Sequence, residues 1–308
     1  MSGKTKKKIR WKEFLPYYLL ALPGVIYMIC NNYLPMFGVI IAFKNLNFRK
    51  GILGSDWCGL DNFKFLFASK DAFTITRNTI LYNVAFIVLT TVLAIAIAIL
   101  VNEIQSRFAS RLYQSLILLP YLMSWVIVSY LVYAFLSAET GLVNNAILEK
   151  LGLKGISWYN SPQYWPFILT FVSLWKSLGY AMIIYFSSIV GISQDYYEAA
   201  TLDGASKWQQ ITKITLPLLK STVIMMLIMS IGRMFYSDFG LFYQIPMNSG
   251  SLFSTTQTID TYVYRALMQQ NDIGMSSAAG FYQSIVGFIL VLSANMLVRK
   301  LSPDDAMF

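Results

Sequence analysis

Residues 198–219 read EAATLDGASKWQQITKITLPLL, a polar and charged stretch between two of the most apolar parts of the chain. Ser193 is suited to cap a helix that enters this stretch, and Ala199 and Ala200 are good helix formers within it. Gly204 is suited to end the helix, because glycine reaches the left-handed C-cap conformation without a side-chain clash. A short polar helix followed by a sharp turn is therefore predicted.

A second short helix is predicted directly after the turn. Ser206 and Gln209 have the S-x-x-Q spacing of a capping box, in which side chain and backbone exchange hydrogen bonds at a helix start. Pro217 fits the first turn of the apolar segment that follows, where its missing N–H is tolerated. The stretch is thus predicted to be a helical hairpin that lies near a membrane surface and joins two membrane spans.

The composition is that of a membrane protein. The 308 residues are 56% hydrophobic and only 13% charged, which is outside the usual balance of a soluble domain. The chain has no histidine, and this removes the commonest metal ligand and proton relay and disfavours much soluble enzymology. Cys30 lies in an apolar run and Cys58 in a polar loop, so we expect both to be free thiols.

Six segments are long and apolar enough to span a bilayer, which requires about 20 apolar residues per helix. Pro35 is expected to kink the first of them, because proline removes a backbone donor and clashes with the preceding turn. We therefore predict an all-α integral membrane protein in which residues 1–308 form a single domain. The predicted spans are approximately 14–43, 79–101, 113–136, 165–190, 217–239 and 277–298.

The basic residues indicate the orientation of the chain in the membrane. Six of the 24 Lys and Arg residues lie within residues 1–12, directly ahead of an apolar segment, which is typical of a cytoplasmic anchor rather than of nucleic-acid binding. That apolar segment is too long for a cleaved signal core and is expected to stay attached. Both termini and loop 191–217 are then cytoplasmic, and the outer loop 44–73 is expected to form a small ordered cap.

The predicted hairpin has the features of a docking surface. Trp208 lies on a polar loop with no membrane core available to it, and an exposed Trp is a frequent anchor of protein interfaces. Glu198 and Asp203 offer carboxylates that could pair with an arginine of a partner. The alternative interpretation is an ordinary surface linker, with Trp208 resting at the lipid interface.

The spacing within the hairpin resembles the cytoplasmic signature of permease subunits of bacterial ABC importers. The resemblance implies the type I importer fold of the maltose permeases, with six transmembrane helices, and it implies that loop 191–217 is the coupling loop that fits a groove in an ATP-hydrolysing subunit. The segments FGVIIAFKNLNF, LLPYLMSWVIV and DFGLFYQIP resemble the carbohydrate branch of the family, in particular its oligosaccharide and polysaccharide subgroup. The signature positions are Glu198, Ala199, Ala200, Gly204, Ile214, Leu216 and Pro217.

The resemblance also implies partners and a location. The chain would pair with a second permease subunit, identical or different, and with two ATPase subunits in the cytoplasm. An extracytoplasmic solute-binding protein would deliver carbohydrate to it. The implied location is the cytoplasmic membrane of a bacterium.

An ATP-driven role requires the nucleotide chemistry to lie on another subunit. Gly3-Lys4-Thr5 imitates the end of a phosphate-binding loop, but no residues precede it that could supply the first glycine and the strand. We therefore expect the chain to be no enzyme and to bind no cofactor or metal. ATP and Mg are assigned to the partner subunits.

An ion-coupled secondary transporter is the main alternative, and a non-transporting membrane scaffold subunit is a second. Ion-coupled carriers usually place carboxylates in the middle of the membrane. All 15 acidic residues of this chain fall in loops or near span ends, with Asp238 the closest to a span interior. This pattern disfavours the carrier, and a scaffold would leave the hairpin unexplained.

Two basic residues, Lys176 and Arg233, are predicted to lie inside the membrane, where a charge facing lipid is costly. They either line a hydrated sugar path or pin helices together through hydrogen bonds. Aromatic rings bind sugars by stacking, although packing in the core is the alternative for each of them. The candidate substrate path comprises Ser124, Trp125, Trp175, Lys176, Arg233, Tyr236 and Asp238.

Overall fold

The computed structural model describes residues 11–64 and 70–301, and helices dominate these residues. Most of the predicted N-terminal basic cluster, together with Gly3-Lys4-Thr5, lies outside the described residues. The longer helices are α1 (Trp11–Met28), α5 (Lys70–Asn102), α6 (Arg107–Leu122), α7 (Trp125–Leu136), α8 (Trp165–Val190), α9 (Gln194–Leu202), α11 (Leu216–Gly232), α13 (Ile259–Gln270) and α14 (Ile273–Leu301).

Shorter elements connect these helices and cover their ends. The short α-helices are α2 (Leu34–Met36), α3 (Gly51–Gly54), α10 (Lys207–Gln210) and α12 (Phe253–Thr256), and the two strands are β1 (Lys44–Asn45) and β2 (Asp56–Trp57). The π turns are η1 (Ile29–Tyr33), η4 (Val143–Leu148), η7 (Ile211–Thr215) and η8 (Gly240–Gln244). The 3-10 turns are η2 (Phe37–Phe43), η3 (Asp61–Phe63), η5 (Trp158–Asn160), η6 (Pro162–Tyr164) and η9 (Gly250–Leu252).

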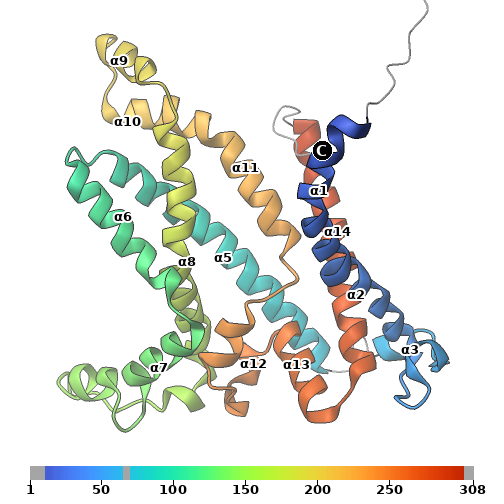
Figure 1. Cartoon of the computed structure of the whole chain (residues 1–308). Coiled ribbons are helices and arrows are strands. Elements are labelled where there is room, and N and C mark those ends of the chain that lie inside the picture. The colour runs from blue at the N-terminus through green and yellow to red at the C-terminus, as the bar shows by residue number, and fades with distance from the viewer. Residues whose placement is uncertain (1–10, 65–69, 302–308) are drawn as a thin grey trace, which may run out of the picture.

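The long helices run between two ends of the molecule. Figure 1 shows the α9–α10 hairpin at the same end as the start of α1 and the end of α14, and we call this the hairpin end. Helices α3, α12 and α13 lie at the opposite end, which we call the distal end. The hairpin, the start of α1 and the end of α14 lie on the same side, as an even number of membrane crossings requires.

Five continuous helical stretches within the described residues are long and apolar enough to cross a membrane. They correspond to five of the six predicted spans. A sixth crossing results if α6 and α7, which are bent by 95° relative to each other, are counted as one broken span. The five stretches are Phe14–Phe43, Asp71–Asn102, Pro162–Val190, Lys207–Gly232 and Ile273–Lys300.

The predicted continuous helix over 113–136 is wrong, because the chain breaks between α6 and α7. Met123 and Ser124 are extended, with ψ angles of 142° and 151°. The Ser124 hydroxyl accepts a hydrogen bond of 3.3 Å from the Ile127 N–H and so caps the start of α7. A break at membrane depth is tolerated only where the freed backbone groups find partners inside the protein.

The helix that contains the second predicted span extends further than the apolar segment, because α5 already begins at Lys70. Its first turns are polar, but tertiary hydrogen bonds hold them against the distal elements. Asn78 Nδ2 donates to the Gln257 oxygen at 2.9 Å, and the Tyr82 hydroxyl donates to the Thr255 oxygen at 2.8 Å. These partners lie around α12, far away in the sequence, so hydropathy alone could not place this boundary.

The predicted end of the fifth span near residue 239 is wrong as well, since α11 ends at Gly232. The chain then turns and is held by α13. The N–H and the hydroxyl of Ser237 donate to Asp260 Oδ2 at 2.6 and 2.7 Å. Residues 233–238 therefore form an irregular segment at the distal end of α11 rather than its last turns.

The second helix of the hairpin was predicted to be a separate short helix, and this prediction is wrong. Helix α10 continues through the π turn η7 into α11, and the three form the stretch Lys207–Gly232. In η7 the Leu216 N–H bonds to the Ile211 oxygen, and Pro217 follows directly. Because proline clashes with the carbonyl one turn earlier, the wider π turn accommodates it without ending the helix.

The N-terminal span loses its regular α-helical bonding at the predicted place. Pro35 lies between the π turn η1 and the 3-10 turn η2. The 3-10 turn packs against α14. There the Phe43 ring meets the Phe281 ring edge to face, with centroids 5.3 Å apart.

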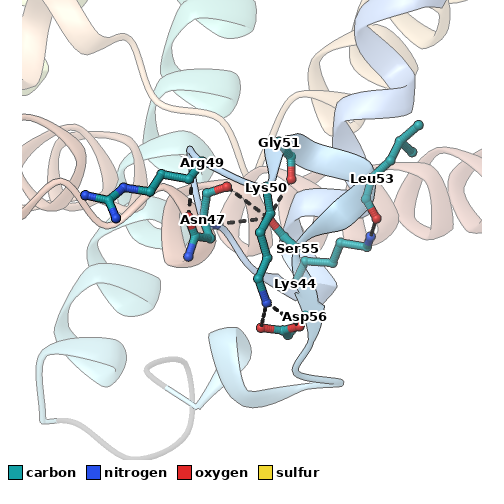
Figure 2. A network of polar contacts seen from close by, with 8 residues as sticks. All are labelled: Lys44, Asn47, Arg49, Lys50, Gly51, Leu53, Ser55 and Asp56. Carbon is teal, nitrogen blue, oxygen red and sulfur yellow. Dashed lines mark hydrogen bonds and ion pairs between the residues drawn. The ribbon is translucent and has the colours of Figure 1, made fainter.

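A small cap follows this span, as the outer loop predicted. Strands β1 and β2 pair antiparallel, and Lys44 Nζ donates to the Leu53 oxygen at the end of α3 at 2.7 Å (Figure 2). The Ser55 hydroxyl donates to the Gly51 oxygen at 2.6 Å, and Lys50 pairs with Asp56 at the exposed edge, at 2.8 Å (Figure 2). The cap is therefore fixed mainly by side chains that satisfy backbone groups of one short helix.

Helix α8 packs along both α5 and α6 in the centre of the molecule. Its approach to α6 depends on Gly179, where an added Cβ would lie 2.2 Å from the Ile117 oxygen. Ala94 and Ala98 of α5 are fully buried in the cluster shared with α8 and α11. Small residues at such crossings let helix backbones come close in a membrane.

We predict that Gly179→Ala lowers the stability of the protein by about 1–3 kcal/mol, because the added methyl group overpacks the crossing of α6 and α8. Thermal unfolding in detergent measures this effect. Gly280→Ala in α14 is the matched control, since no atom lies within 4 Å of its Cβ position. Equal melting temperatures for the two variants would contradict the role of Gly179.

Candidate functional site

The first candidate site is the α9–α10 hairpin, and its local structure follows the predicted capping signals. The Ser193 hydroxyl accepts a hydrogen bond from the Asp195 N–H at the start of α9. Gly204 has a φ of +79°, the left-handed conformation predicted for it. Ser206 and Gln209 form both bonds of the capping box at the start of α10, at 3.4 and 2.7 Å.

Tertiary hydrogen bonds close the hairpin into a rigid unit. Gln210 is buried, and its side-chain amide donates to the Thr201 hydroxyl at 2.9 Å. The Tyr197 and Thr215 hydroxyls are hydrogen-bonded at 2.9 Å. Lys207 forms an ion pair of 3.1 Å with Glu103 at the end of α5, so the hairpin is also tied to the neighbouring span. Exposed pairs of this kind contribute about 0–1 kcal/mol each, so the uncharged bonds carry most of the rigidity.

The outer surface of the hairpin carries large apolar side chains in the open. Trp208 is 71% exposed, as predicted for a docking residue. Leu202 and Tyr196 are 89% and 58% exposed, and the sequence analysis missed both. The sequence does contain a signal for Leu202, because it is an apolar residue at the end of a polar helix, directly before the Asp203-Gly204 turn. Exposed apolar groups around an aromatic anchor are the composition of an interface.

The remaining predicted docking residues lie on both arms of the hairpin. A hollow of about 320 Å³ between the arms is lined by Ala200, Asp203, Gly204 and Ile214, among others. Glu198 and Ala199 are exposed on α9, and Leu216 and Pro217 are exposed where the hairpin joins α11. The structure thus brings the signature positions onto one compact element.

The second candidate site is a polar cleft of about 620 Å³ between α5, α8, α11 and the segment after α11. It contains three of the predicted path residues, Arg233, Tyr236 and Asp238. The hydroxyl and amide residues of the cleft were missed. The spacing of small polar residues along one helix face could have indicated them, since Ser173 and Ser177 are four residues apart on α8. The missed polar residues are Asn83, Thr90, Thr91, Ser173, Ser177, Tyr185, Ser230 and Ser237.

Lys176 is buried beside this cleft and bonds to the broken helix. Its ammonium donates to the oxygens of Pro120, Tyr121 and Met123 at 3.4, 2.9 and 2.6 Å. Pro120 and Tyr121 belong to the last turn of α6 and Met123 follows it, and the Pro120 oxygen also accepts the Met123 N–H at 3.2 Å. The geometry is that of a hydrogen-bonded pin between α8 and α6. A contact of Lys176 with substrate stays a prediction.

Trp125 connects Lys176 with the cleft. Its ring lies 5.0 Å from Lys176 Nζ, and its Nε1–H donates to Asp238 Oδ2 at 3.0 Å. Gly240 lies close to the ring, because an added Cβ there would clash with Trp125 Cδ1. Ser124 caps α7 next to it. Trp125 therefore reaches the cleft through its hydrogen bond to Asp238, and neither Trp125 nor Ser124 is among the residues that line the cleft.

Trp175 lies apart from the other path residues. It packs against a hydrophobic cluster that includes Val128, Leu169 and Val172, and it lines a separate apolar groove of about 600 Å³ between α7 and α8. Phe167 and Phe171 line the same groove, and it is almost without polar atoms. A role of Trp175 in substrate binding stays a prediction, and its surroundings are those of a packing residue.

Comparison with known proteins places this architecture in a family. A family model described as the binding-protein-dependent transport system inner membrane component matches residues 90–303. Two proteins of Bacillus subtilis (strain 168) are similar to the chain over most of their length. Protein LplB is 33% identical over 288 residues, which cover 93% of this chain and 89% of that protein. The polygalacturonan/rhamnogalacturonan transport system permease protein YteP is 35% identical over 287 residues, which cover 93% and 88%.

Solved structures show the same arrangement. A chain of a bacterial ABC transporter involved in the import of the acidic polysaccharide alginate matches with a TM-score of 0.86 at 30% identity, over 96% of this chain and 100% of that chain. A chain of a bacterial alginate ABC transporter in complex with an alginate pentasaccharide-bound periplasmic protein also matches, with a TM-score of 0.86 at 30% identity, over 96% of this chain and 99% of that chain. The predicted family and its helical membrane fold are confirmed, and the chain belongs to the binding-protein-dependent transport system inner membrane components.

Proposed function

We propose that this protein is the permease subunit of an ATP-driven importer that moves a carbohydrate, an oligosaccharide or polysaccharide fragment, into the cytoplasm. The observation that carries the proposal is the rigid hairpin that presents the signature residues together with exposed Leu202 and Trp208. Large apolar side chains that are grouped on a water-exposed surface are typical of a site that a partner covers. An ATPase subunit in the cytoplasm is that partner.

The cleft supports the carbohydrate part of the proposal. Hydroxyl and amide groups from three helices line it, beside the rings of Phe86, Tyr236 and Phe239. Polar groups that satisfy sugar hydroxyls, next to rings that stack on sugar faces, are what a carbohydrate requires. The polysaccharide names carried by YteP and by the matching transporter structure agree with this chemistry.

The proposed assembly contains a second permease, two ATPases and an extracytoplasmic binding protein. The second permease, identical or different, covers the open side of the cleft, so that the path runs between the two subunits. ATP and Mg belong to the ATPases, and this chain binds neither. In this arrangement the hairpin end with both termini faces the cytoplasm, and the distal end meets the binding protein.

Copurification from the native membrane tests the assembly. Affinity isolation of the tagged chain in mild detergent should recover a nucleotide hydrolase, a second permease and a lipid-anchored or soluble binding protein. If the chain is recovered alone from the membranes of cells grown on several carbohydrates, the proposal is contradicted and the scaffold or the ion-coupled transporter is favoured instead.

We predict that Gly204→Val leaves membrane insertion intact but abolishes both ATPase copurification and sugar-stimulated ATP hydrolysis. A β-branched residue resists the φ of +79° that the turn requires, so the two arms of the hairpin lose their register. Gly152→Val is the matched control, because Gly152 has a φ of +68° and lies in the exposed connection between η4 and η5, outside the hairpin. Its variant should retain the ATPase, and equal loss in both variants would show general misfolding instead of a docking defect.

We predict that Lys176→Met lowers the thermal stability of the isolated chain while ATPase copurification is retained. The Tyr121 and Met123 oxygens lose the ammonium donor, while the Pro120 oxygen keeps the Met123 N–H, and each buried acceptor left without a partner costs about 1–3 kcal/mol. Lys150→Met at an exposed loop position is the control. Unchanged stability of Lys176→Met, together with altered uptake, would show that Lys176 serves the substrate instead of the fold.

A further inference from the structure

We infer that the cargo is an acidic carbohydrate and that Arg233 binds its carboxylate in the polar cleft. A uronic acid unit is the chemical class that this requires. The inference rests on the proposed import function and specifies its substrate, and it follows from the balance of charge around the cleft.

Two charged residues line the cleft, and one of them, Asp238, is already bound within the protein. Asp238 Oδ2 accepts the Trp125 Nε1–H at 3.0 Å, and Oδ1 accepts the Leu241 N–H at 3.3 Å. The second bond makes Asp238 the cap of the helical turn that follows it. The Lys176 ammonium lies 5.0 Å from the centre of the same Trp125 ring and interacts electrostatically with the Asp238 carboxylate. Asp238 is therefore a structural anion with both oxygens occupied.

Arg233 is in the opposite situation. It lies at the C-cap of α11, where its backbone N–H bonds to the Ser230 and Ile231 oxygens. Its guanidinium forms no hydrogen bond and no ion pair with any residue in the described ranges 11–64 and 70–301. A planar cation with five N–H groups thus faces the cleft with its donors open.

The neighbouring acid does not supply the missing partner. Asp260 lies behind the same segment, but its oxygens accept from Ser237 and from the Gln283 amide, and it does not line the cleft. A bidentate carboxylate is the ligand that fits a guanidinium fork best. The cleft volume of about 620 Å³ lies in the range of small-molecule sites.

The surrounding groups suit the rest of a sugar unit. Ser230 and Tyr236 are near Arg233 in the sequence and line the same cleft, so hydroxyl groups accompany the cation. The Tyr236 hydroxyl is hydrogen-bonded to Ser284 at 2.9 Å, which fixes its ring. One face of the cleft thus offers a carboxylate partner, hydroxyl partners and an oriented ring.

The test uses the complete transporter in vesicles and two matched cargoes. One is an oligogalacturonate, and the other is its carboxyl-reduced counterpart of the same length, in which a neutral hydroxymethyl group replaces each carboxylate. A glucuronate oligosaccharide and its reduced form repeat the comparison with another stereochemistry. Uptake and ATPase copurification are measured for the natural chain, for Arg233→Gln and for Arg233→Lys, with Arg299→Gln at the far end of α14 as the control.

We expect the natural chain to prefer at least one acidic cargo over its reduced form. Arg233→Gln should lower uptake of that cargo about tenfold or more, because a hydrogen bond to a charged group is lost, and should leave the ATPase bound. Arg233→Lys should retain part of the uptake, since it keeps the charge but not the bidentate fork.

Three results would overturn the inference. Equal uptake of acidic and reduced cargo, unchanged in Arg233→Gln, would leave the proposed import function standing with a neutral cargo. Equal loss of every cargo together with loss of the second permease would show that Arg233 pairs with that subunit. Absence of uptake of all four cargoes would refute the acidic class, and the copurified ATPase would then show whether import itself still holds.

Discussion

The structure depends on one constraint, which is that backbone carbonyl groups at a helix break inside a membrane must find donors within the protein. The break between α6 and α7 meets this constraint through Lys176 of the neighbouring helix α8, whose ammonium reaches the carbonyl oxygens of Pro120, Tyr121 and Met123. The resulting bend directs Trp125 toward Gly240 and Asp238. The wall of the cleft therefore follows from a hydrogen-bonding requirement of the backbone.

Lysine serves the same purpose a second time in this chain. Lys44 is buried and donates to the last carbonyl groups of α3, as Lys176 does for α6. A flexible ammonium with three donors is well suited to several carbonyl oxygens, whereas the planar guanidinium of Arg233 suits a carboxylate. A hydropathy profile does not distinguish these basic residues, but their chemistry does: the two lysines suit a structural role and Arg233 suits a binding role.

The two candidate sites are joined by one continuous piece of helix. The stretch Lys207–Gly232 begins next to Trp208 on the hairpin and ends at the residue before Arg233. At 1.5 Å per residue such a stretch is about 40 Å long, and packed helices move as rigid bodies. Under the proposed function, a displacement of the hairpin by an ATPase reaches the cleft without passing through a flexible loop. The π turn η7 accommodates Pro217 without ending the helix, and the connection therefore stays continuous.

The sequence by itself determined the membrane class, five of the six spans and the turn chemistry of the hairpin. These features depend on local composition and spacing, as in the left-handed Gly204 and the capping box of Ser206. Only the tertiary structure decided the break in 113–136, the early start of α5, the early end of α11 and the membership of the cleft. Each of these is set by a partner distant in the sequence, such as Lys176 for α6 or Asp260 for Ser237, and hydropathy contains no information about which distant residue satisfies a polar group.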